Sequence, residues 1–160
     1  MIINYENVEL IKFPYVHDAV FEGLCYNYYP KKISFSLQNT YINTTVNCIL
    51  NNVLFFEMQG CSFWGGGNAL YYASCYKKHD FLQRIQERVC TETTAHPNWY
   101  SISKNTHYIV FELIINSGDT LLVVCESVEF ELNKAGDGLP EGQGDGSVVP
   151  LVSLRKDSPF

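Results

Sequence analysis

Short segments in which apolar and polar residues alternate constrain the fold of this chain most strongly. The clearest case is residues 33–38, ISFSLQ, in which every second residue is apolar. Successive side chains of a strand point to opposite faces, so this pattern predicts a strand with one buried and one wet face. Related patterns predict further strands near residues 8–13, 19–26, 45–50, 53–59, 70–75, 107–115 and 121–132. We therefore expect a mainly β protein of about eight strands, folded as an antiparallel β-sandwich or a curled sheet.

One short helix is expected to accompany the strands, over about residues 80–89. Asp80 is a good N-terminal cap, and apolar residues follow it at helical spacing, ending at Val89. Residues 90–104 are polar and predict a long loop. Asn51–Asn52 is a candidate hairpin turn, because Asn tolerates the left-handed backbone that tight turns need. Leu121–Val124 is apolar on both faces, which predicts a central position in a sheet.

The chain of 160 residues suits one domain followed by a tail. Residues 1–132 contain all the predicted strands and are expected to form a single globular domain. Residues 133–160 differ in composition, since 135–146 carry five of the eleven glycines and predict a flexible linker. The apolar run 148–152 contains Pro150, which permits an edge strand at most.

The charge balance and the cysteines narrow the class of protein. A net charge of −6 argues against a nucleic-acid binder and suits a soluble protein or one with a basic partner. The six cysteines form no C-x-x-C pair, no signal peptide is recognisable, and no apolar run is long enough to cross a membrane. We therefore expect reduced thiols, a cytoplasmic location, no membrane contact, no metal and no cofactor.

Residues 53–75 predict two strands joined by a glycine loop. A phosphate-binding loop needs glycines that lead into a helix, often with a lysine. Here a predicted strand follows Gly65–Gly67 and no lysine does, so a structural turn is the simpler interpretation. The alternative is a recognition loop in which Trp64, Tyr71 and Tyr72 bind a partner, since Trp and Tyr are common anchors of interfaces.

Candidate carboxylates for chemistry lie in predicted strands, namely Glu57, Glu112, Glu126, Glu129 and Glu131. By alternation Glu129 and Glu131 share one face and point to solvent. Together with Asp119 they form either an ordinary solvated face or an acidic docking surface for a basic partner. Catalytic carboxylates, as in glycoside hydrolysis, are a third interpretation. Glu126 falls on an apolar face, so it is either an inward carboxylate that needs a partner or the site of a bulge.

Three further sets of residues could carry chemistry. His17 and Asp18 could form a catalytic pair if they lie in a loop, although Asp18 also suits a turn. Cys61 is the best candidate for a nucleophile, but it needs a base beside it and a cationic environment. The spacing of cysteines and histidines is too irregular for a zinc site.

Three segments resemble small bacterial immunity proteins of polymorphic and contact-dependent toxin systems. They are a first strand followed by His17-Asp18-Ala19, residues 55–65 (FFEMQGCSFWG), and residues 117–126 (SGDTLLVVCE). The resemblance covers roughly residues 5–132 and leaves out the tail. It implies a cytosolic inhibitor that binds and neutralises a toxin domain, often a nuclease, and it supplies no set of functional residues.

Two other functions stay open from the sequence. One is a small-ligand or carbohydrate-binding β-sandwich, with Trp64, Tyr71 and Tyr72 as a stacking platform. The other is an enzyme that uses Cys61 with a histidine. The sequence does not determine the strand order or the oligomeric state.

Overall fold

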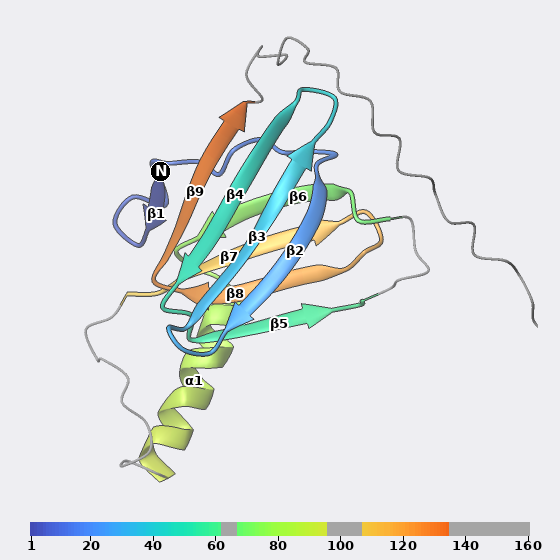
Figure 1. Ribbon diagram of the computed structural model, residues 1–160. Coiled ribbons are helices and arrows are strands. Elements are labelled where there is room, and N and C mark those ends of the chain that lie inside the picture. The colour runs from blue at the N-terminus through green and yellow to red at the C-terminus, as the bar shows by residue number, and fades with distance from the viewer. Residues whose placement is uncertain (62–66, 96–106, 135–160) are drawn as a thin grey trace, which may run out of the picture.

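Two antiparallel β-sheets and one helix make up the fold, so the prediction of a mainly β protein is confirmed (Figure 1). The computed structural model describes residues 1–61, 67–95 and 107–134. Within these ranges the elements are β1 (Ile2–Asn4), β2 (Val20–Asn27), β3 (Lys32–Asn39), β4 (Thr44–Asn51), β5 (Phe55–Gln59), β6 (Leu70–Tyr76), α1 (Asp80–Ala95), β7 (Ile109–Ile115), β8 (Thr120–Cys125) and β9 (Ser127–Lys134).

The strands divide into a five-stranded first sheet and a four-stranded second sheet. The first sheet has the order β1-β9-β4-β3-β2, and the second has the order β5-β8-β7-β6. In Figure 1 the strands of the first sheet cross in front of those of the second at a steep angle. The glycine-containing connection of residues 60–69 therefore joins two opposite edges of the second sheet, because β5 and β6 are not paired with each other.

The two sheets enclose the main hydrophobic core. Phe111 of the second sheet and Phe130 of the first are almost completely buried there, and Phe13 contacts both rings with centroid distances of 5.4 Å. A second, smaller core lies on the other side of the second sheet, where Phe81 and Ile85 of α1 pack near Val124. The second sheet is thus covered on both faces, and the apolar strand β8 is central in it, as its composition predicts.

The chain crosses between the sheets at two corners that lie side by side. β4 pairs with β9 in the first sheet, and β5 pairs with β8 in the second. At the first corner Asn52 has a φ of 49°, and its side-chain amide donates to Glu126 Oε2 at 2.7 Å. The left-handed Asn52 is as predicted, but the expected hairpin at Asn51–Asn52 is wrong, because the two strands it joins belong to different sheets.

Glu126 occupies the second corner, between β8 and β9. Its backbone N–H donates to Asn51 O at 3.1 Å, and its carboxylate accepts from Asn52. Because the strand is interrupted at Glu126, the alternation of side chains does not continue across it. Val124 faces the helix, while Val128 faces the main core. The expected bulge is therefore wrong in form, because residues 121–132 are two strands in different sheets, with Glu126 between them.

The predicted strand over residues 8–13 is wrong, because this segment forms turns. The side chains of Asn4 and Asn7 bond backbone amides just before this segment, with Asn7 Oδ1 accepting from Asn4 N at 2.8 Å. The carbonyls of the same two residues accept from Val8 N and Ile11 N, both at 2.9 Å. Such local side-chain bonds compete with strand pairing. The first strand instead lies earlier, at β1.

The helix is longer than expected, since α1 runs to Ala95 and replaces the first part of the predicted loop 90–104. Residues 96–104, the glycine-loop residues 62–66 and the predicted tail from 135 onward lie outside the described residues. The predictions for Trp64, for Gly65 and Gly66, and for the linker therefore stay predictions. Gly67 is described, and the strand β6 follows it, as the sequence predicts.

Candidate functional site

Tyr71 and Tyr72 lie on different sides of the second sheet. A bulge between Leu70 and Tyr72 inserts Tyr71 as an extra residue, which is 58% exposed. Tyr72 is half-buried and donates its hydroxyl to Glu112 Oε2 at 2.5 Å. Tyr71 lies against His17, whereas Tyr72 bonds Glu112, so the two rings do not form the stacking platform expected for a carbohydrate site.

Glu112 is the centre of a small polar network at the edge of the second sheet. It accepts hydrogen bonds from Tyr72 and, at 3.1 Å, from Tyr76. His79 Nε2 lies 4.0 Å from its other carboxylate oxygen. Burial, followed by the charge of Glu112 and the hydrogen bond to it, raises the pKa of Tyr76 to about 12. The network holds β6, β7 and the start of α1 together, and Glu112 is not a free catalytic carboxylate.

Glu57, another expected candidate for catalysis, is also engaged. Its carboxylate pairs with the guanidinium of Arg84 on α1 at 3.0 Å. The pair ties the edge strand β5 to the helix, so Glu57 has a structural role in this arrangement.

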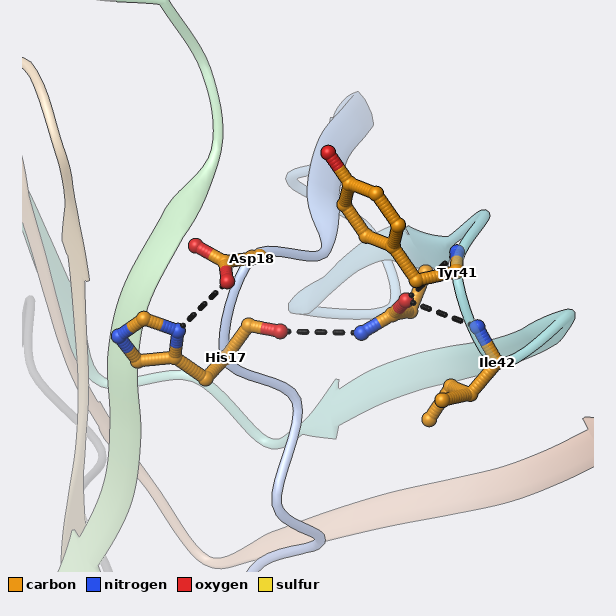
Figure 2. Close-up of polar contacts among 5 residues, drawn as sticks. His17, Asp18, Tyr41 and Ile42 are labelled. Carbon is orange, nitrogen blue, oxygen red and sulfur yellow. Dashed lines mark hydrogen bonds and ion pairs between the residues drawn. The ribbon is translucent and has the colours of Figure 1, made fainter.

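One end of the sandwich gathers exposed aromatic side chains around His17 and Asp18. These two residues lie in a turn, where His17 Nδ1 is 3.0 Å from Asp18 Oδ2 (Figure 2). Asp18 has a φ of 63°, which fits the turn role predicted for it. The His17 ring contacts Tyr15 at 6.0 Å and Tyr71 at 5.9 Å between centroids. We call Tyr15, His17, Asp18 and Tyr71 the tyrosine end.

The buried Asn39 joins this cluster to the β3–β4 turn. Its amide nitrogen donates to His17 O at 3.0 Å, and its Oδ1 accepts from the backbone of Tyr41 and Ile42 at 3.0 and 3.3 Å (Figure 2). Tyr41, 86% exposed, is thereby presented to solvent on a fixed backbone beside the tyrosine end. A rigid, exposed tyrosine suits recognition, because little conformational entropy is lost when it is buried by a partner.

The outer face of the first sheet carries the acidic residues predicted to point to solvent. Glu129 and Glu131 on β9 are both exposed, which confirms their expected orientation. The register places Glu131 beside Asn47, then Ser36 and finally Glu22 across four strands. We call Glu22, Glu129 and Glu131 the acidic face. In the described part of this face the strands contribute one lysine at its margin, Lys32, and no described element covers it.

Asp119 does not belong to this surface. It is only 7% exposed and lies in the β7–β8 turn of the second sheet, packed against Gly60. The expectation that Asp119 forms one acidic face with Glu129 and Glu131 is therefore wrong. The reason is the corner at Glu126, which sends the two halves of the predicted hairpin strand into different sheets.

Cys61 is exposed, but the structure offers it no visible activation. Among the described residues no histidine lies within hydrogen-bonding distance of its sulfur, and no group of three or more His, Cys, Asp or Glu could hold a metal ion. Burial raises the pKa of Cys48 and of Cys75 to about 12, so these thiols stay protonated and unreactive at neutral pH.

Sequence reasoning missed Glu22, Tyr15 and Tyr41 as surface residues. Glu22 has a readable signal, since it alternates with Phe21 in a predicted strand. Tyr15 and Tyr41 lie in turns, where no periodicity shows which side of the chain faces water. Their exposure follows from Asn39 and the backbone bonds around it, which are tertiary contacts.

Neither similarity to known proteins nor a membrane-spanning helix helps to assign a role to this site. In the ranges that the structure describes, no helix is long and apolar enough to cross a membrane. No protein-family model matches the chain, and no curated protein matches its sequence.

Proposed function

We propose that this chain is a non-catalytic binding protein that binds and neutralises a basic toxin domain in the cytoplasm. The observation that carries the proposal is the acidic face, a sheet surface that no described element covers, on which the described strands place three carboxylates and one marginal lysine. A basic partner would be attracted to this surface by charge complementarity. A nuclease domain is the expected kind of toxin, because such domains grip phosphates with clustered cations.

The tyrosine end supports the proposal by supplying anchors next to the charged surface. β9 runs from Glu129 through Glu131 toward the end of the first sheet that holds the β3–β4 turn and Tyr41. Charges at a rim mainly accelerate association, whereas buried aromatic residues contribute most of the affinity. A partner that covers both regions would gain both effects.

The first experiment tests neutralisation directly. The genes that flank the gene of this chain are first searched for a toxin domain. The chain is then co-expressed with that domain, and growth is compared with that of cells that express the toxin alone; the absence of a flanking toxin gene also counts against the proposal. Restored growth together with a purified one-to-one complex is the expected result. Unchanged toxicity, or no complex by size-exclusion chromatography, contradicts the proposed function.

The second experiment tests the surface. Glu129→Lys with Glu131→Lys should weaken the complex at least about tenfold in calorimetric titration, which corresponds to roughly 1.4 kcal/mol. The matched control is Glu6→Lys with Glu9→Lys, at two exposed positions in the N-terminal turns, which changes the net charge equally. Equal losses in both variants would show that only net charge matters, and unchanged affinity in the first would exclude the acidic face.

A further inference from the structure

A cavity of about 530 Å³ lies at the opposite end of β6 from the tyrosine end. Four separate segments line it, namely Tyr5 of the N-terminal turns, the β6–α1 connection, the first turns of α1, and the residues that precede β7. Its volume is in the range of pockets that bind small molecules. The cavity is distinct from the acidic face and from the tyrosine end, and it shares no residue with either.

Positive charge is concentrated in this cavity, although the whole chain is acidic. Lys77 and Lys78 line it, and Asp80 is the one carboxylate among its lining residues. In the described structure neither lysine forms an ion pair with a carboxylate, in contrast to Arg84 and Arg88, which do. Two lysines that line the same concave site are suited to an anion that carries two negative charges.

Two stacked aromatic rings lie beside the Lys77 ammonium group. The Lys77 ammonium lies 4.2 Å from the centroid of the Tyr5 ring, and the Tyr5 ring stacks on His107 at 4.6 Å with an interplanar angle of 22°. A cation–π contact of this kind orients an ammonium group without neutralising it. The Tyr5 ring therefore positions Lys77 at the cavity.

His79 helps to shape the site. Its Nδ1 accepts from the backbone N–H of Phe81 at 3.1 Å. Its Nε2 faces Glu112 at 4.0 Å. These contacts hold the ring between the helix start and the polar network of β7.

We propose that the Lys77–Lys78 cavity binds a small ligand through a phosphate group. A phosphate dianion matches the two ammonium groups in charge, and Gln86 is a further hydrogen-bond donor of the lining. The carboxylate of Asp80 opposes the anion, and it limits the affinity that the two lysines provide.

The test is a titration with inorganic phosphate, followed by two-dimensional amide NMR at constant ionic strength. We expect saturable shifts at residues 77–80 and 107–108, and at least about tenfold weaker binding in Lys77→Gln with Lys78→Gln. The matched control, Lys31→Gln with Lys32→Gln, removes the same charge from the distant β2–β3 turn and should bind normally. Asp80→Asn keeps the size of the side chain but removes the opposing charge, so it should bind phosphate several-fold more tightly. The cap expected at Asp80 is wrong, because His79 accepts the bonds at the start of α1 and Asp80 is the first residue of the helix.

Three outcomes would overturn the proposal. They are the absence of saturable shifts at the lining residues, an equal loss of binding in the control variant, and equally tight binding of acetate. The last outcome would show a general monoanion site, because acetate carries a carboxylate and a single charge. Thermal unfolding of each variant without phosphate checks that any loss is not due to misfolding.

Discussion

Gly60→Ala tests the packing of the loop after β5 against the β7–β8 turn. Gly60 has a φ of +95°, and an added Cβ would lie 2.2 Å from Asp119 Oδ1 and 3.1 Å from Asp119 Cα. A side chain cannot occupy that space unless the turn moves. Gly118 is a matched control, because its φ is +90° and nothing lies within 4 Å of its added Cβ. The two substitutions thus share the backbone strain and differ in the steric clash.

The expected free-energy changes follow from this difference. Left-handed backbone costs an alanine about 1–2 kcal/mol, which is the whole effect expected for Gly118→Ala. Gly60→Ala must also displace the buried Asp119 side chain, which adds about 1–3 kcal/mol if its polar contacts are lost. We therefore expect Gly60→Ala to lower the free energy of unfolding by roughly 2–5 kcal/mol in total.

The free energy of unfolding of both variants is measured by urea titration monitored by circular dichroism. An unchanged m-value checks that unfolding stays two-state. The double variant Gly60→Ala with Asp119→Ala completes a cycle, and it should recover part of the loss because the clashing oxygen is gone. Equal destabilisation by Gly60→Ala and Gly118→Ala would refute the reasoning. It would mean that the loop is not packed on Asp119.

Two further predictions concern ionisable groups. In the folded protein a thiol reagent should modify the exposed cysteines, which are Cys25, Cys61 and Cys90. Cys48, Cys75 and Cys125 should react only on unfolding, because burial raises the pKa of their thiols and the thiolate is the reactive form. Fast modification of all six cysteines would contradict this prediction. Tyr76 has a pKa of about 12 instead of 10.0, so between these pH values the unfolded chain loses its proton before the native protein does. Stability should fall as the pH rises through this interval, and Tyr76→Phe should show a smaller fall in its urea midpoint; an equal fall would count against the assignment.

The sequence predicted elements better than it predicted connections. The alternation in residues 33–38 and the doubly apolar segment 121–124 depend on which faces of a strand are buried, which is a local signal. Asn51–Asn52 was correctly recognised as a place for left-handed backbone, but such a residue suits a hairpin and a corner equally well. Only the pairing of distant strands, which has no local signal, decides between them.

In the candidate site, too, the sequence predicted what depends on local alternation and missed what depends on irregular residues. The outward direction of Glu129 and Glu131 follows from alternation and is confirmed. Asp119 was grouped with them on the assumption of one continuous strand, which Glu126 interrupts. Tyr71 and Tyr72 were grouped by their proximity in the sequence, and the bulge at Leu70 separates them. In each case a single irregular residue changed the face on which a side chain lies.

The adjacent corners at Asn52 and Glu126 have a consequence for how the protein folds. They make β4–β5 and β8–β9 one bent ribbon that passes through both sheets, and the bonded side chains are 74 positions apart in the sequence. The β4–β9 and β5–β8 pairings require this long-range closure, whereas β7–β8 is a local hairpin. High contact order of this kind slows folding, and a shared ribbon makes partial unfolding of one sheet alone costly. The two sheets should therefore behave as a single cooperative unit, with the closure of the ribbon as the step that commits the chain to its fold.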